Sequence, residues 1–211
     1  MADSMMKKTA ILLLSLGIIF LFTSCIGIEG EINVNADGSG SLSMSYRISK
    51  LIAHLGQLEE NGQFTPLPVN QEDFARTIES SRGIELTGFQ ESENEQDVLI
   101  TADLSFESIN SLNSFFMYGE NNAVMLEERD SGTVFTYYLY SGRETVPEQR
   151  QLDILSTIFK DYSINLKINA PAEIKSVNRG DISGDGRVAS LTLSMPDIIS
   201  SENEIFWQVI W

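Results

Sequence analysis

The stretch IEGEINVNADGSGSLSMSYRI, residues 28–48, decides the fold of this chain. Polar and apolar residues alternate on both sides of the run Asp37-Gly-Ser-Gly40, as they do in strands with one buried face. Gly38 and Gly40 suit a tight turn because glycine adopts positive φ without a Cβ clash. The stretch therefore predicts a β-hairpin with a core on one side. The apolar side chains of its second strand share that side: Leu42, Met44, Tyr46 and Ile48.

The same alternation recurs twice further along the chain. Residues 83–89 and 97–106 predict a second hairpin, joined by the polar tip 91–97. Residues 123–128 and 133–140 predict a third hairpin. Antiparallel pairing of neighbouring strands is the expected result, because short connections can join only antiparallel strands.

Single helices and further strands fill the rest of the chain. Apolar residues at helical spacing predict helices over 49–58, 70–81, 108–118 and 147–162. Alternation predicts strands over 163–169, 173–178, 187–195 and 205–211, with a turn at 179–186 and a short helical turn near 196–200. The fold class that follows is α+β, with a mostly antiparallel sheet built from successive β-hairpins and helices packed on one face.

The N-terminal segment has the layout of a signal peptide. Residues 1–8 carry two lysines, and residues 10–22 contain no charge. A helix over the uncharged run would span roughly 20 Å, short of the ~30 Å hydrocarbon core of a bilayer. We therefore expect residues 1–24 to be a signal peptide, and residues 25–211 to form a single domain. Met1, Met5 and Met6 are all possible starts.

Cys25, the only cysteine, follows two small residues at the end of this segment. The run Leu21-Phe22-Thr23-Ser24-Cys25 resembles the lipobox of bacterial lipoproteins, with Phe22 where leucine is usual. The resemblance implies cleavage after Ser24 and attachment of acyl chains such as palmitate to Cys25. Two or more acyl chains hold a protein stably at a membrane. An uncleaved membrane anchor with an incidental cysteine is the alternative.

The charge balance limits the partners of the chain. It has 14 Lys and Arg residues against 30 Asp and Glu residues, a formal net charge of −16. Such a body is repelled by phosphate backbones, so we expect no nucleic-acid partner. The expected partner is a membrane, reached through the acyl chains on Cys25. This places the protein in the cell envelope, and Ile26 after the cysteine favours the outer membrane or the periplasmic face.

Catalytic and metal-binding residues are not indicated. His54 is the only histidine and the sequence has no G-x-S-x-G motif, so we expect no enzyme and no cofactor. The runs 35–40 and 181–186 contain Asp-Gly pairs but lack the spacing of a calcium loop, and tight turns use the same pairs. We therefore expect turns at both places and no metal.

Aromatic residues are the remaining candidates for a site. Residues 115–118 hold more aromatic side chains than one buried helical stripe requires, and residues 205–211 are apolar on both faces of a strand. Such segments pack in the core, border an apolar groove or meet a partner. The candidate ligand-binding residues are Phe115, Phe116, Tyr138, Trp207 and Trp211.

The start of the expected mature chain resembles that of LppM-like bacterial lipoproteins. The resemblance is carried by the lipobox cysteine, the runs 30–34, 37–40 and 46–49, the proline turn at Pro196 and the aromatic run ending at Trp211. It implies an α+β domain outside the cytoplasm that binds lipids or glycolipids. Members of that family often end in a second membrane helix, whereas this sequence stops at Trp211. No ligand-contacting residue is carried over.

Two functions follow from these observations. The preferred hypothesis is a membrane-anchored, non-enzymatic module that binds a lipid, glycolipid or other apolar ligand between sheet and helices. The alternative is a structural lipoprotein that docks another envelope protein through its apolar C-terminal strand. An enclosed apolar cavity of at least ~300 Å³ would favour the first, and a filled core with an exposed apolar patch would favour the second.

Overall fold

The computed structural model describes residues 27–50, 68, 70–116, 122–142 and 149–211. The predicted signal peptide, Cys25, His54 and most of the predicted helix over 49–58 lie outside the described residues.

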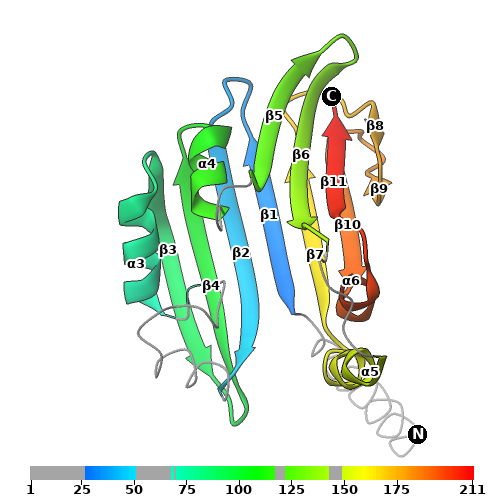
Figure 1. Cartoon of the computed structure of the whole chain (residues 1–211). Helices are drawn as coiled ribbons and strands as arrows, with labels where there is room; N and C mark the ends of the chain where they lie inside the picture. The colour runs from blue at the N-terminus through cyan, green and yellow to red at the C-terminus, as the bar shows by residue number, and fades with distance from the viewer. Residues whose placement is uncertain (1–26, 51–67, 69, 117–121, 143–148) are drawn as a thin grey trace, which may run out of the picture.

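The larger of two sheets has seven strands in the order β3-β4-β2-β1-β7-β10-β9. Its members are β1 (Ile28–Val34), β2 (Gly40–Ser49), β3 (Ile84–Glu93), β4 (Asp97–Phe106), β7 (Ser163–Asn169), β9 (Asp181–Ile182) and β10 (Val188–Ser194). The β1–β2 and β3–β4 hairpins lie side by side through β2 and β4. Strand β7 joins β1 in parallel, and every other pair in this sheet is antiparallel (Figure 1).

The smaller sheet has four strands in the order β5-β6-β11-β8. Its members are β5 (Val124–Arg129), β6 (Gly132–Tyr140), β8 (Ser176–Val177) and β11 (Ile205–Ile210). The third predicted hairpin supplies β5 and β6, and the C-terminal strand β11 pairs with β6. Figure 1 shows this sheet lying over part of the larger one.

The described helices are short, and polar side chains cap the N-termini of several of them. They are α3 (Gln71–Ser80), α4 (Ile109–Phe116), α5 (Gln149–Ile158) and α6 (Met195–Ser200). The Asn70 side chain accepts a hydrogen bond of 2.9 Å from Asp73 N and so caps α3, as Asn does at helix starts. Helices α3 and α4 lie over the β3–β4 side of the larger sheet, whereas α5 and α6 lie together at one end of it (Figure 1).

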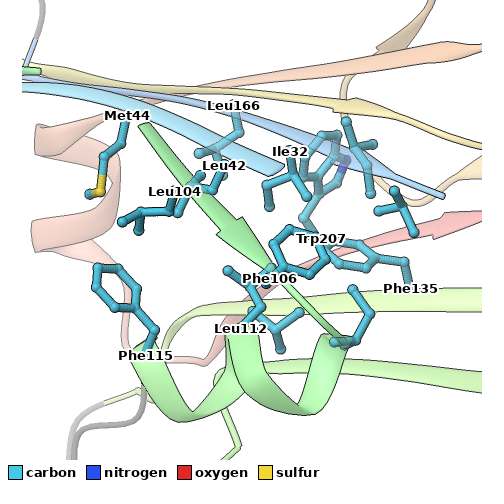
Figure 2. Close-up of a cluster of buried hydrophobic side chains, with 14 of the residues drawn as sticks. Ile32, Leu42, Met44, Leu104, Phe106, Leu112, Phe115, Phe135, Leu166 and Trp207 are labelled. Atoms are coloured by element: carbon cyan, nitrogen blue, oxygen red, sulfur yellow. The ribbon is translucent and has the colours of Figure 1, made fainter. Parts of the chain in front are cut away.

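The core lies between the two sheets and beneath α4. Alternate residues of the large sheet, such as Ile32, Leu42 and Leu104, face Phe135 and Trp207 of the small sheet (Figure 2). Leu112 and Phe115 of α4 point into the same cluster (Figure 2). One face of the large sheet is therefore apolar and covered, and the polar residues of the same strands point away from it.

The predicted α+β class and the three hairpins are confirmed. Two predictions were wrong in detail. The strands form two sheets instead of one, so the small sheet takes part of the face predicted to be covered by helices alone. The predicted strand over 173–178 shrinks to Ser176–Val177, and β9 lies inside the predicted turn at 179–186. Strands β8 and β9 each pair with a neighbouring strand at only two positions, and the alternation of residues in the sequence does not reveal such short pairings.

Candidate functional site

The uncovered side of the large sheet carries two rows of polar side chains, which we call the polar face. Strand register sets the rows, because residues paired across neighbouring strands point to the same side. The first row runs Thr101, Ser45, Glu29, Asn165, Thr192 across β4, β2, β1, β7 and β10. The second row runs Asp103, Ser43, Glu31, Lys167, Ser190 across the same strands.

Hydrogen bonds link some of the neighbouring side chains within each row. In the first row Thr192 Oγ1 donates to Asn165 Oδ1 at 2.8 Å, and Thr101 Oγ1 donates to Ser45 Oγ at 3.3 Å. In the second row Ser43 Oγ donates to Asp103 Oδ1 at 2.7 Å. These bonds fix the orientation of the hydroxyl groups before any ligand arrives.

A shallow groove of about 420 Å³ lies between the two rows. Its floor is the row Met44, Gly30, Leu166, Leu191, whose side chains belong to the core side of the strands. A Cβ on Gly30 would lie 3.0 Å from Leu166 Cδ2, so glycine lets Leu166 fill the core at this point. The groove walls carry hydroxyl, amide, carboxylate and ammonium groups: Glu29, Glu31, Ser43, Ser45, Thr101, Asn165, Lys167, Ser190 and Thr192.

One end of the polar face is closed by a charged and aromatic cluster. Arg47 Nε lies 3.6 Å from Asp97 Oδ2, and Arg47 Cζ lies 4.9 Å from the centroid of the Tyr162 ring. Arg47 N donates to the Gly27 carbonyl at 3.2 Å, so this end is also where the chain enters β1.

The groove begins a few residues after the predicted acylation site in the sequence. Glu29, in the first row, lies four residues after Cys25 in the sequence. Four residues of extended chain span at most ~14 Å. A lipid attached at Cys25 would therefore hold the groove near the headgroups of the bilayer.

The charges of the groove favour a neutral ligand. Among the residues that line the groove, Glu29 and Glu31 carry carboxylates and Lys167 is the one cation, and all three side chains are exposed. A phosphate would meet this excess of negative charge, which adds to the net charge of −16. Sugar hydroxyl groups pair equally well with carboxylate acceptors and hydroxyl donors.

Three of the aromatic candidates lie in the core. Phe115, Trp207 and Trp211 have exposed fractions of 8%, 0% and 7%. Trp207 Nε1 donates to the Arg179 carbonyl at 3.0 Å, which satisfies the only polar atom of the indole. These side chains fill space between the sheets.

The other two candidates lie apart from each other. The Phe116 ring is half-buried, 5.4 Å from Phe115 and 5.2 Å from Tyr137, centroid to centroid. Tyr138 is 37% exposed on the outer side of the small sheet, where its ring lies 6.0 Å from that of Phe206. The structure thus brings Phe116 and Phe115 together and separates both from Tyr138.

The two Asp-Gly runs form side-chain-supported turns. Hydrogen bonds from the hydroxyl and then the N–H of Ser39 hold the pKa of Asp37 below its usual value. Hydrogen bonds from the Ser183 hydroxyl and then from Arg187 N lower the pKa of Asp185 in the same way. Within the described ranges, no three His, Cys, Asp or Glu side chains gather as metal ligands do.

The polar face was not singled out from the sequence, although a signal for it is present. Serine occupies alternate positions 41, 43 and 45 of β2, and Asn165 and Lys167 alternate in the same way on β7. Alternation identifies these as outward-facing residues. It does not show that β1 and β7, which are more than a hundred residues apart, bring them together.

Comparison with known proteins gives a likeness in fold. No family model and no curated protein matches the chain. The chain is similar to the folded domain of the Mycobacterium tuberculosis protein LppM, solved by NMR. The two share 12% sequence identity over 87% of this chain and 88% of that one, with a TM-score of 0.49. No residue role or ligand follows from this likeness.

Of the helices in the described part of the chain, none is long and apolar enough to cross a bilayer.

Proposed function

We propose that this chain is a membrane-anchored lipoprotein of the bacterial envelope whose polar face binds the uncharged, hydroxyl-rich headgroup of a glycolipid. The observation that carries the proposal is the groove between two hydrogen-bonded polar rows, four residues along the chain from Cys25. The protein acts by binding and not by catalysis.

Two properties of the groove support a sugar ligand. Its walls offer donors and acceptors of several kinds on a rigid sheet, so a ligand with many hydroxyl groups pairs without leaving polar groups unsatisfied. The groove also lies where an anchored protein would meet headgroups and not acyl chains. The proposed site lies on the opposite side of the large sheet from α3 and α4, so it replaces the apolar groove between sheet and helices that the sequence predicted; the ligand proposed is the polar part of a glycolipid.

The alternative, docking of another envelope protein through β11, has weaker support. Strand β11 pairs with β6 along one edge, and Lys175 N and Asn178 N donate to the Ile210 and Gln208 carbonyls along the other. Both edges are therefore used within the chain, and a partner could reach only the outer side near Phe206. Of the two aromatic side chains that lie together on that side, Phe206 and Tyr138, only Tyr138 is exposed.

The membrane attachment is tested with Cys25→Ser in the full chain. We expect loss of fatty-acid labelling and of signal-peptide processing. We also expect a change in the share of the protein that fractionates with membranes. Unaltered labelling and processing in this variant would remove the anchor from the proposal.

Ligand binding is tested on the full acylated chain in phosphatidylcholine nanodiscs. The probe is a neutral diglycosyl glycerol, the headgroup without its acyl chains, and glycerol phosphate serves as the anionic comparison. Ser190→Arg places a long cation in the groove, whereas Ser92→Arg makes the same change on the edge strand β3, outside it.

We expect saturable binding of the sugar probe only, weakened about tenfold by Ser190→Arg through the loss of one or two hydrogen bonds. Ser92→Arg should bind as the unchanged protein does. Equal loss in the two variants, or preference for the phosphate, would contradict the proposed site.

A further inference from the structure

We infer that α5 is a membrane-contact helix, which lies on the bilayer surface beside the anchored N-terminus and inserts Ile154 and Leu155 among the lipids. The observation behind this is an apolar helix side that the described residues leave exposed. Ile154 is 51% exposed and Leu155 is 37% exposed, and no residue of α5 is fully buried among those whose side chains the structure describes.

The helix is amphipathic, with a wider apolar side than its docking needs. At 100° per residue Leu152, Ile154, Leu155 and Phe159 fall within one side of the helix or its continuation, which also includes the exposed Gln151. Gln149, Asp153 and Thr157 fall on the other side. The side nearest the protein holds Leu152 and Phe159, which are half-buried. Ile154 and Leu155 lie at the edge that faces away from it.

Helix α5 is also attached to the rest of the protein through few contacts. Its main neighbour among the described elements is α6, whose Ile198 and Ile199 are buried. Figure 1 shows both helices beyond the end of the large sheet at which β1 begins. The apolar residues of α5 thus extend the molecule at that end without forming part of the core between the sheets.

A lipid bilayer is the occupant that the N-terminus indicates. A Cβ on Gly27 would lie 3.2 Å from the Tyr162 ring and 3.0 Å from the Ser163 carbonyl, so the chain enters β1 directly against the segment that follows α5. Cys25 lies two residues before Gly27, within ~7 Å of extended chain. Whether acyl chains on Cys25 or the apolar run 10–22 enters the membrane, α5 is carried to its surface.

The charges near α5 permit this contact. Arg150 and Lys160 balance Asp153 and Asp161, so residues 149–162 are neutral in a chain of net charge −16. Lysine at the edge of an interfacial helix extends its ammonium group into water while its stem stays among lipids. The helix itself therefore adds no net negative charge that would repel the bilayer.

The inference rests on the membrane attachment in the proposed function and is independent of the glycolipid ligand. It is tested with the full acylated chain in phosphatidylcholine vesicles, using a fluorophore sensitive to polarity on Leu155→Cys. Acylation caps Cys25, so the introduced thiol is the only one labelled. The matched control is Thr157→Cys, which is exposed two residues away on the polar side of the same helix.

We expect brominated lipids to quench the label at position 155 at least about twofold more than the label at position 157. Replacing Ile154 by Gln should reduce the quenching at 155 without affecting flotation of the vesicles with bound protein. Equal quenching at both positions, or none at either, overturns the membrane-contact helix.

Two further outcomes separate the possible failures. If the labelled protein does not float with vesicles, the attachment in the proposed function fails together with this inference. If the protein floats but the signal at 155 rises with the protein-to-lipid ratio, a second copy of the chain covers the helix, and the bilayer contact alone is refuted.

Discussion

The guanidinium group of Arg47 lies over the ring of Tyr162, with Cζ 4.9 Å from the ring centroid. Arg47 belongs to β2 and Tyr162 to the segment between α5 and β7, so this contact fastens the α5 end of the molecule to the large sheet. Asp97 completes the arrangement at 3.6 Å from Arg47 Nε, and both charged side chains are less than one-fifth exposed, at 19% and 13%.

Tyr162→Ala should lower the free energy of unfolding by about 2 kcal/mol, because it removes a cation–π contact and an aromatic pair with Phe159. Tyr162→Phe keeps the ring and should cost less than about 0.5 kcal/mol. Urea unfolding of the full chain in detergent measures both changes. Similar losses in the two variants would mean that the hydroxyl group, and not the ring, is what matters.

Gly132→Ala should destabilise the small sheet strongly. Gly132 has φ +127°, and a Cβ there would lie 2.3 Å from the Trp211 carbonyl oxygen. Thr133 N donates to that same oxygen at 3.0 Å, so the backbone cannot move aside without breaking this bond. We expect a loss of more than about 1 kcal/mol in urea unfolding.

Gly184→Ala is the control for this change. A Cβ at Gly184 would meet no atom within 4 Å, and its φ lies outside the left-handed region. Its unfolding midpoint should match that of the unchanged chain. A tolerated alanine at 132 would show that the C-terminus does not pack against the β5–β6 turn.

Local patterns predicted the strands far better than they predicted their arrangement. Ser163–Asn169 has the bounds expected from alternation, and Asn70 caps α3 as its side chain suggests. The parallel pairing of β1 with β7 depends on the packing of the whole chain, so no local pattern encodes it. The polar face follows from that pairing and was missed for the same reason.

Two aromatic residues that the sequence predicted as ligand contacts lie in the core instead. Trp207 and Phe115 were candidates because large aromatic side chains are common in binding sites. The structure uses both to fill the space between the sheets and beneath α4 (Figure 2). A sequence cannot separate these roles, since each requires the same apolar surface.

Trp207→Phe tests the packing role of the indole directly. It leaves a gap in a site with no exposed surface and removes the donor to the Arg179 carbonyl, so we expect a loss of about 1–3 kcal/mol. Tyr138→Phe, at an exposed ring, should change stability by less than about 0.5 kcal/mol.

Both variants should bind the sugar probe normally below their unfolding temperatures, because neither side chain lines the groove. Thermal melts and binding isotherms on the same preparations make the comparison. Loss of binding in Trp207→Phe without a loss of stability would indicate that the ligand binds at the aromatic cluster and not in the groove.

Alkaline pH should destabilise the protein through buried tyrosines. Burial, and secondly the charge of Asp73, raises the pKa of Tyr46, whose hydroxyl donates to the Pro68 carbonyl. Burial raises the pKa of Tyr137 as well. In the unfolded chain both phenols titrate near their ordinary value of about 10. The unfolded state therefore loses protons that the folded state retains, and stability is full below about pH 10 and falls above it.

The slope of this fall is the quantity to measure, by urea unfolding between pH 8 and about pH 11.5. Each tyrosine contributes up to about 1.4 kcal/mol per pH unit in this range. Tyr46→Phe loses a hydrogen bond and should be less stable at pH 8, yet its stability should fall less steeply above about pH 10. One shared slope for Tyr46→Phe and the unchanged chain would mean that the Tyr46 phenol ionises as easily in the folded state as in the unfolded chain. That result would contradict the burial of Tyr46 and its hydrogen bond to the Pro68 carbonyl.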